Sequence, residues 1–424
     1  MKVLLLNNTD SGGGAAVASY RLLTALRVKN VDATLGVVDK KTVDKNVIKL
    51  PQKKICLFYR FVSKIFVKFI NLIWKRLKKP FEFKTSNSVF HSTNFKSKID
   101  VNWINNSDYD IVHLHWINSD MISIKDIARI KKPIVWTMHD TWSFCGAEHY
   151  PNMLENDIRY KTGYLKSNKP NSTKGFDLCR KVWLKKKKYL SNKEITFISP
   201  SNWEKKCLEE SALFGGKKCL VIPNILSSVF KPMDKASIRK LLNIPADKKI
   251  IGFGAAYDID NPKGIKGSYY LIQALNLLDN PSDYFVVVFG NASSKFLSQL
   301  TIPYFSSGFI TNEQILAMLY NACDVFLCPS IIENLPFTCL ESTFCGIPVT
   351  AFNVGGIPDI VEHKVTGYLA KPYDCKDLAN GIESCVLNRD FLSKGCIRKT
   401  KDFNSSDIVR MHINLYESLL HSIT

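Results

Sequence analysis

The sequence feature that most constrains the fold is the stretch 328–352, which reads Cys-Pro-Ser-Ile-Ile-Glu-Asn-Leu-Pro-Phe-Thr-Cys-Leu-Glu-Ser-Thr-Phe-Cys-Gly-Ile-Pro-Val-Thr-Ala-Phe. Its beginning predicts a buried strand that ends near Ser330. The run 336–345 predicts a helix that ends at Gly346, and a second strand follows over 348–352. A strand, a loop, a helix and a further strand are typical of α/β proteins.

Two carboxylates flank the start of the predicted helix, Glu333 in the loop and Glu341 on the helix itself. Both can then face one elongated ligand that lies across the helix start, where free backbone N–H groups and the helix dipole favour phosphate. A nucleotide diphosphate sugar is such a ligand. The alternative is a pair of solvated acids, because two glutamates eight residues apart are common in a chain with 38 acidic residues.

Two segments that follow this stretch carry further motifs, Asn353-Val-Gly-Gly-Ile-Pro-Asp-Ile-Val361 and Val365-Thr-Gly-Tyr-Leu369. With the Glu-x7-Glu spacing, their Gly-Gly-Ile-Pro and Thr-Gly sequences resemble the family 4 glycosyltransferases (GT4), retaining enzymes with the GT-B fold. The resemblance covers nearly the whole chain. It implies an α/β protein with two Rossmann-like domains that face each other across a cleft. It also implies transfer of a sugar from a nucleotide diphosphate sugar to an acceptor hydroxyl, with retention at the anomeric carbon.

Chain length also favours two domains, because 424 residues exceed what one hydrophobic core usually supports. The segment Asn224–Pro232 matches the interdomain linker of the family. The predicted units are an acceptor-binding domain over 1–227, a nucleotide-sugar-binding domain over 228–404, and a last helix over 405–424 that crosses back to the first domain.

Composition is that of a folded protein with reduced cysteines. The apolar run at the start is too short for a signal peptide, and no run reaches 18 uninterrupted apolar residues, so we expect a cytoplasmic protein. The twelve cysteines form no Cys-x-x-Cys pair, and several lie in apolar runs. This pattern favours buried thiols over a disulfide or zinc framework.

The formal net charge of +20 calls for a polyanionic partner. Nucleic acid, an anionic membrane surface and phosphorylated substrates are the candidates. No nucleic-acid-binding module is recognisable in the sequence, which disfavours the first of them.

Residues 53–79 contain no acidic side chain and point to a membrane. At about 100° per residue, polar and mostly basic side chains fall in one narrow sector of a helix, opposite a broad aliphatic and aromatic face. These side chains are Lys53, Arg60, Lys64, Lys68, Asn71, Lys75 and Lys78. The pattern is typical of a helix in the headgroup plane of an anionic bilayer, so we expect a peripheral protein on the inner face of the cell membrane. The alternative is a core-packed helix with a solvated basic face.

A glycine-rich turn follows the first predicted strand, residues 2–8, and precedes a helix that ends near Val28. Glycines allow a backbone to approach an anionic or sugar ligand closely, because they lack Cβ atoms. The Gly-x-Gly-x-x-Gly pattern is not met, since Val17 stands at the third glycine position. The resemblance places the loop in the interdomain cleft, with Gly13 and Gly14 contacting donor phosphate or acceptor. A plain tight turn is the alternative.

Histidines lie at the C-terminal ends of two further predicted strands, 109–116 and 133–140, where ligands bind in open α/β sheets. The blocks His-Leu-His-Trp and Trp-Thr-x-His-Asp resemble the GT4 subgroup that builds bacterial exopolysaccharide and O-antigen. The resemblance implies an acceptor side made of His115, His139 and Asp140, with His139 in a catalytic position where it polarises or orients the attacking hydroxyl. A structural role for the histidines is the alternative.

The predicted donor side lies in the second domain. Lys266 and Gly267 match a Lys-Gly pair of the family, so Lys266 would neutralise the leaving diphosphate. Many members place an arginine where this chain has Ala255, and Lys263 is the substitute we expect. Asp258 and Asp260 are interpreted as loop acids and not as metal ligands.

The resemblance assigns each part of the donor to residues of this chain. Glu341 would accept hydrogen bonds from the ribose hydroxyls, because a carboxylate can accept both. Glu333 would hold the sugar with backbone groups of Asn334 and Leu335. Lys266 and the helix start near Pro336 would stabilise the diphosphate.

The reaction implied by these residues needs no metal or cofactor. We expect catalysis by His139, Glu333 and Lys266, without a covalent glycosyl-enzyme. The partners are a UDP- or GDP-sugar and a lipid-linked oligosaccharide acceptor of bacterial surface polysaccharide biosynthesis. A noncatalytic nucleotide-sugar or glycan binding protein is the alternative function.

Overall fold

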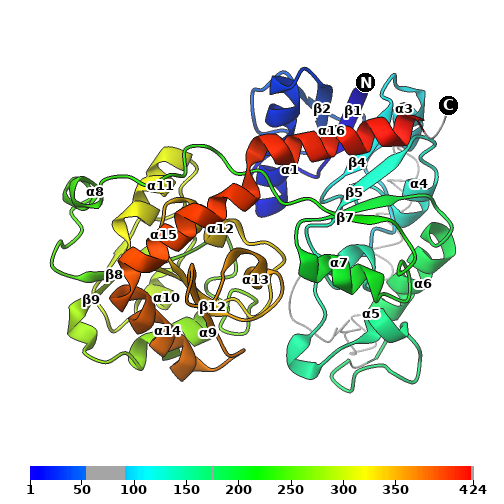
Figure 1. The fold of residues 1–424 in the computed structure, drawn as a ribbon. Helices are drawn as coiled ribbons and strands as arrows, with labels where there is room; N and C mark the ends of the chain where they lie inside the picture. Colours follow the sequence, from blue (N-terminus) through cyan, green and yellow to red (C-terminus); the bar gives the residue numbers. More distant parts are fainter. Residues whose placement is uncertain (54–90, 174, 422–424) are drawn as a thin grey trace.

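The computed structural model describes residues 1–53, 91–173 and 175–421, which form two α/β domains side by side (Figure 1). Each domain contains one wholly parallel sheet. The strand orders are β3-β2-β1-β4-β5-β6-β7 in the first domain and β10-β9-β8-β11-β12-β13 in the second. Two Rossmann-like domains are therefore confirmed. Apart from Lys53, the predicted basic helix over 53–79 lies outside the described residues.

The first domain is built from short buried strands and helices of mixed length. Its strands are β1 (Lys2–Leu6), β2 (Asp32–Val37), β3 (Val47–Lys49), β4 (Ile111–Leu114), β5 (Ile134–Thr137), β6 (Thr196–Ser199) and β7 (Cys219–Val221). Its helices are α1 (Gly14–Val28), α3 (Val101–Asn106), α4 (Ile124–Ala128), α5 (Arg159–Thr162), α6 (Leu178–Leu190) and α7 (Asn202–Glu209), with 3-10 turns η1 (Thr141–Ser143) and η2 (Met153–Glu155).

The second domain repeats the pattern. Its strands are β8 (Lys249–Ala255), β9 (Tyr284–Gly290), β10 (Tyr304–Ser306), β11 (Val325–Cys328), β12 (Val349–Phe352) and β13 (Gly367–Ala370). Its helices are α8 (Lys235–Leu241), α9 (Ser268–Asn276), α10 (Ser294–Leu297), α11 (Glu313–Ala322), α12 (Phe337–Phe344), α13 (Ile357–Ile360), α14 (Cys375–Leu387) and α15 (Arg389–Lys399), with 3-10 turns η3 (Pro281–Asp283) and η4 (Thr400–Phe403). Gly346 has φ +74°, a left-handed conformation that ends α12 as the sequence predicts.

Buried apolar strands and capped helices explain why these segments fold as they do. Central strands such as β11 and β12 are buried along their whole length, because helices cover both faces of a parallel sheet. Side chains of Ser201, Asn312 and Asp374 accept hydrogen bonds from the first turns of α7, α11 and α14. The glycine loop and the loops after β4, β5, β8 and β11 all follow the carboxyl ends of strands, which places the predicted site residues at one edge of each sheet.

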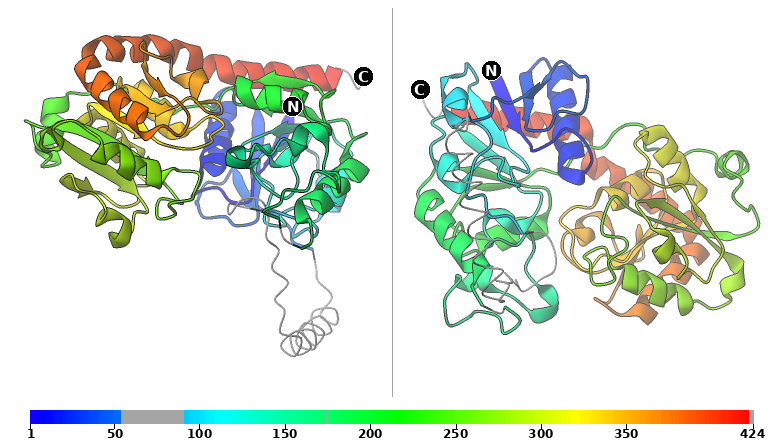
Figure 2. Two further views of the ribbon diagram at one scale, coloured as in Figure 1. Left: turned by 90° about the horizontal axis from the view of Figure 1, so that it is seen from below. Right: turned by 180° about the vertical axis from the view of Figure 1, so that it is seen from behind.

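The last helix, α16 (Ser405–His421), joins the two domains (Figures 1 and 2). It runs from the second domain along the first, where it packs against α1. One continuous apolar core contains Leu22 of α1, Phe230 of the linker, Tyr320 of α11 and Tyr416 of α16. The hydroxyl of Tyr416 lies 2.7 Å from Nδ1 of His113 on β4.

Loss of the Tyr416 hydroxyl is predicted to destabilise the first domain. Tyr416→Phe keeps the packed ring but leaves a buried nitrogen of His113 without its partner, which typically costs about 1 to 3 kcal/mol. We expect a lower thermal unfolding midpoint in differential scanning calorimetry. Met411→Ala on the exposed side of the same helix is the matched control. An unchanged midpoint for Tyr416→Phe would show that this hydrogen bond contributes nothing.

Candidate active site

The loop between β11 and α12 forms the centre of the candidate site. Pro336 is the N-cap of α12 and provides no side-chain hydrogen bond to the helix start. Glu333 lies in the loop before it, with 11% of its side chain exposed, and Glu341 lies on the helix with 7% exposed. The predicted order of strand, loop acid, helix start and helix acid is therefore correct. An uncapped helix start next to two carboxylates suits a ligand with both phosphate and hydroxyl groups.

Lys266 and Glu333 form a close ion pair within the second domain. The Lys266 ammonium donates to Glu333 Oε1 at 2.5 Å, and Ser330 Oγ donates to the same oxygen at 3.1 Å. Burial disfavours the lysine charge, but the charge and hydrogen bond of Glu333, together with Tyr257, outweigh burial and the pKa of Lys266 is raised. Lys266 is thus a permanent cation held beside the helix start.

Glycines allow three backbone segments to meet around this pair. A Cβ atom at Gly267 would lie 1.9 Å from the carbonyl oxygen of Pro329, and Gly267 has φ +69°. A Cβ atom at Gly355 would lie 2.0 Å from the carbonyl oxygen of Glu333. Gly356 donates its N–H to that same oxygen at 2.9 Å. The Lys-Gly and Gly-Gly motifs therefore hold the Glu333 loop in place by close backbone packing.

Glu341 meets the first domain through a residue that the sequence does not single out. Arg21 on α1 donates to Glu341 Oε1 at 3.2 Å, and Tyr320 donates to Oε2 at 3.0 Å. Burial raises the pKa of Glu341 to about 7, although Arg21 and Tyr320 oppose this rise. The predicted ribose acceptor is therefore buried at the domain interface, with one bond from each domain.

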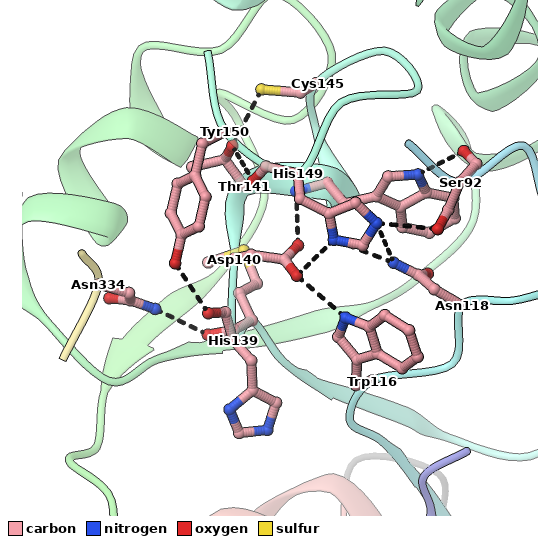
Figure 3. Close-up of polar contacts among 12 residues, drawn as sticks. Ser92, Trp116, Asn118, His139, Asp140, Thr141, Cys145, His149, Tyr150 and Asn334 are labelled. Carbon is pink, nitrogen blue, oxygen red and sulfur yellow. Dashed lines mark hydrogen bonds and ion pairs between the residues drawn. The ribbon is translucent and has the colours of Figure 1, made fainter. Parts of the chain in front are cut away.

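Asn334 lies beside the predicted sugar site, but its side chain points to the first domain (Figure 3). Its amide nitrogen donates to the carbonyl oxygen of Met138 at 3.1 Å and to the Glu204 carboxyl group. Its amide oxygen accepts a hydrogen bond from Ser201 at 2.6 Å. The side chain thus ties the domains together, and the predicted contacts of Asn334 and Leu335 with the sugar are left to their backbone groups.

The glycine loop of the first domain faces the start of α12. A Cβ atom at Gly14 would lie 3.9 Å from the ring of Phe337, the first residue of α12. Cβ atoms at Gly12 and Gly13 would meet nothing within 4 Å, so open space lies in front of them. The N-cap of α1 is Gly13, which supplies no side-chain hydrogen bond. Two uncapped helix starts from different domains therefore converge.

The two histidines of the predicted acceptor side lie together. Nδ1 of His115 lies 2.9 Å from Nε2 of His139, and the two rings are stacked. Burial lowers the pKa of His139 to about 4, so its imidazole is neutral at pH 7. His113, the third histidine, is fully buried between Thr137 and Tyr416 and has a structural role.

Asp140 belongs to a buried hydrogen-bonded network that follows His139 (Figure 3). Its Oδ2 lies 2.6 Å from Nδ1 of His149 and accepts a hydrogen bond from Trp116 Nε1 at 3.2 Å. Nε2 of His149 lies 2.8 Å from Ser92 Oγ. Burial would raise the pKa of Asp140, but His149, the N–H of Trp142 and His139 together outweigh burial and the pKa is lowered. Asp140 therefore anchors the loop that carries His139.

Carboxylates of the predicted donor and acceptor sides both raise the pKa of the Tyr150 phenol. Its hydroxyl donates to the carbonyl oxygen of His139 at 3.5 Å (Figure 3). Burial raises the pKa of Tyr150 well above its usual value, and the charges of Glu333 and Asp140 raise it further. Because both carboxylates affect Tyr150, the loops after β5 and β11 face each other across the domain interface.

Two further predicted features have a more open setting. Lys263 is exposed, and its backbone N–H donates to the side-chain oxygen of Asn261. Asp258 accepts a hydrogen bond from the N–H of Ile265, and Asp260 accepts one from Ser293. Both acids therefore shape the loop after β8, as interpreted from the sequence. This loop and Asn291 line a hollow of about 470 Å³.

In the described parts of the chain, no group of three or more His, Cys, Asp and Glu side chains is arranged to hold a metal ion. The same described parts contain no helix that is both long and apolar enough to cross a membrane.

Sequence comparison shows which protein family the chain is similar to. Residues 234–402 match the family described as "Glycosyl transferases group 1". The chain is similar to group 1 glycosyltransferases. A D-inositol 3-phosphate glycosyltransferase of Streptosporangium roseum is 26% identical over 340 residues, which cover 74% of this chain and 71% of that protein. Another from Stackebrandtia nassauensis is 30% identical over 177 residues, which cover 39% of this chain and 40% of that protein. These relatives support nucleotide-sugar transfer as the class of activity.

Solved structures show the same fold over the full length. HepE of Anabaena, in complex with UDP and glucose, has a TM-score of 0.65 at 18% identity, covering 99% of this chain and 100% of that one. Sucrose-phosphate synthase of Thermosynechococcus elongatus also has a TM-score of 0.65 at 18% identity and covers 99% of each chain. The fold is therefore GT-B, as the sequence predicts.

Replacement of Lys266 is predicted to reduce sugar transfer strongly. Lys266→Met keeps most of the side-chain volume but removes the cation beside the helix start, and loss of one such group typically lowers kcat by about a hundredfold or more. Steady-state kinetics with a nucleotide sugar measures the effect. Lys240→Met on the exposed face of α8 is the control. A near-normal kcat for Lys266→Met would mean that the phosphates bind elsewhere.

Proposed function

We propose that the protein is a retaining glycosyltransferase that moves a sugar from a UDP- or GDP-sugar to a hydroxyl group of an acceptor. The observation that carries this proposal is the convergence of two uncapped helix starts, at Gly14 and Phe337, near the cation Lys266. Backbone N–H groups and an ammonium are the groups that bind a diphosphate. The similarity to group 1 glycosyltransferases supports the same reaction.

The leaving group would be stabilised by the protein alone. As the bond between the sugar and the diphosphate breaks, negative charge grows on the diphosphate oxygens. Lys266 and the N–H groups at the start of α12 would stabilise this charge. Because these groups supply the positive charge that a metal ion would supply, we infer that transfer is metal-independent.

We infer that Glu333 binds the sugar and does not attack it. One of its oxygens already accepts hydrogen bonds from Lys266 and Ser330. A carboxylate held this way is a weak nucleophile but a good acceptor for sugar hydroxyls. We infer that the acceptor hydroxyl attacks from the face that the diphosphate leaves, without a covalent glycosyl-enzyme. Neutral His139 would orient that hydroxyl through a hydrogen bond.

The acceptor we propose is a lipid-linked oligosaccharide of bacterial surface polysaccharide biosynthesis. The His-Leu-His-Trp and Trp-Thr-x-His-Asp blocks around His115 and His139 support it. The net charge of +20 and the acid-free segment 53–79 support binding to the anionic, cytoplasmic face of the cell membrane, where such acceptors are reached.

Donor consumption is the decisive test of the proposed reaction. A panel of UDP- and GDP-sugars is first screened for a rise in the thermal unfolding midpoint, because a ligand that binds the folded state stabilises it. The sugar nucleotides that stabilise the protein are then incubated with lipid-linked acceptors, with and without a chelator. We expect release of the nucleotide diphosphate and a product with retained anomeric configuration. Stabilisation without consumption would instead support a noncatalytic binding protein.

Membrane binding is predicted to depend on the apolar face of segment 53–79. Replacing Phe58, Phe66 and Phe69 together by serine should release the protein from anionic liposomes in a sedimentation assay, because burial of aromatic rings adds to the attraction of the basic stripe. Phe391→Ser, at an exposed position on α15, is the control. Unchanged sedimentation of the triple variant would refute membrane binding through this segment. Competition with RNA at matched salt tests a nucleic-acid partner.

A further inference from the structure

Arg21 reaches from the first domain into the predicted nucleoside end of the donor site. Its Nη2 donates to Glu313 at 2.7 Å and to Glu341 at 3.2 Å, and its Nε donates to Glu313 at 3.2 Å. Glu313 begins α11 and Glu341 lies on α12, so both acids belong to the second domain. One side chain of α1 therefore binds two helices of the facing domain.

Aromatic rings and burial fix the position of the guanidinium. Its central carbon lies 4.7 Å from the ring centre of Phe337 and 5.6 Å from that of Phe230. Only 9% of the Arg21 side chain is exposed. Stacking of this kind leaves the edge of the guanidinium available for hydrogen bonds.

One nitrogen at that edge lacks a partner. Nη1 of Arg21 is buried, and no acceptor within the described ranges of the chain lies in hydrogen-bonding reach of it. Folded proteins rarely leave a charged donor in this state, because its desolvation is uncompensated. The unused N–H groups lie next to Phe337 and to the carboxylate of Glu341, where a ligand oxygen would complete the arrangement.

We propose that Arg21 is a donor-recognition residue supplied by the first domain, with Nη1 binding an oxygen of the donor nucleoside while Nη2 holds Glu341 for the ribose hydroxyls. This inference rests on the proposed function, since it assigns a partner to the same donor site. Glu341 keeps acceptor capacity, because Oε1 accepts from Arg21, Oε2 accepts from Tyr320, and each oxygen has a second lone pair. Nucleotide affinity then depends on both domains.

Arg21 also controls the charge of Glu341. The groups that face this carboxyl are Arg21 from α1, and Tyr320 and Glu313 from α11. Burial raises the pKa of Glu341 to about 7, Glu313 raises it too, and Arg21 and Tyr320 lower it. Without Arg21 the pKa rises further, so the carboxyl is protonated at pH 7 and loses acceptor capacity. Raising the pH restores the carboxylate, so part of the lost affinity should return.

The test is calorimetric titration of the full chain with UDP and with GDP at pH 7 and pH 9. For the nucleotide that binds, Arg21→Gln should raise Kd about tenfold at pH 7, as expected for loss of a hydrogen bond to a charged group. The ratio of variant to wild-type Kd should shrink at pH 9. Titration of the nucleotide itself cancels in this ratio. Arg27 lies on the same helix and donates to Asp32 and to the carbonyl oxygen of Ala33 in its own domain, so Arg27→Gln should bind as the wild type does.

Two further variants separate recognition from simple anchoring of the domains. Arg21→Lys keeps a cation near Glu341 but loses the planar fork, so it should weaken binding equally at both pH values. Glu313→Gln weakens the interdomain ion pair while leaving the Arg21 contact with Glu341, and should change Kd by less than threefold.

The outcomes distinguish the inference from the function on which it rests. The role of Arg21 would be overturned if Arg21→Gln and Arg21→Lys bound the nucleotide with wild-type affinity. It would also be overturned if Glu313→Gln lost as much affinity as Arg21→Gln at both pH values. In either case the proposed function would stand. A wild-type protein that binds neither UDP nor GDP would contradict the proposed function itself.

Discussion

The proposed diphosphate site depends on the close approach of two helix starts that belong to different domains. Gly14 of α1 lies against Phe337 of α12, where a Cβ atom would be 3.9 Å from the ring, and neither helix start is capped by a side chain. The first backbone N–H groups of a helix have no partner within it, so each of these helix starts favours a negatively charged group, and Lys266 adds a cation on the side of the second domain. A phosphate group bound there would be held by backbone groups that need no rearrangement. The glycine loop before α1 leaves its backbone open to a ligand, because Cβ atoms at Gly12 and Gly13 would meet nothing within 4 Å.

The same interface couples the chemistry to the arrangement of the domains. Asn334 directs its amide group to Ser201 and Met138 of the first domain, while the neighbouring residue Glu333 holds Lys266 within the second. Farther along α12, Glu341 accepts a hydrogen bond from Arg21 of the first domain. Each predicted donor acid is thus adjacent to an interdomain bond. A relative rotation of the domains would change the donor pocket and the acceptor side together, so binding and catalysis should respond to the same motion.

Local sequence patterns predict much of this structure because the elements are short, apolar and bounded by strong signals. The stretch 328–352 folds as expected, since Gly346 adopts the left-handed conformation that ends a helix. The sequence does not predict α15, because its apolar residues do not recur on one helical face. The sequence alone also does not identify Arg21 and His149 as residues of the site. Their partners Glu341 and Ser92 lie 320 and 57 residues away, and no local pattern reports such long-range contacts.

A structure of the protein with UDP or GDP bound would show directly where the diphosphate binds. We expect the two phosphates to lie at the start of α12 near Pro336, opposite Gly13. Lys266 should contact a phosphate oxygen, and the ribose hydroxyls should bind Glu341. Density for the nucleotide at any other place, or a helix start filled by packed side chains with Lys266 still bound only to Glu333, would contradict it.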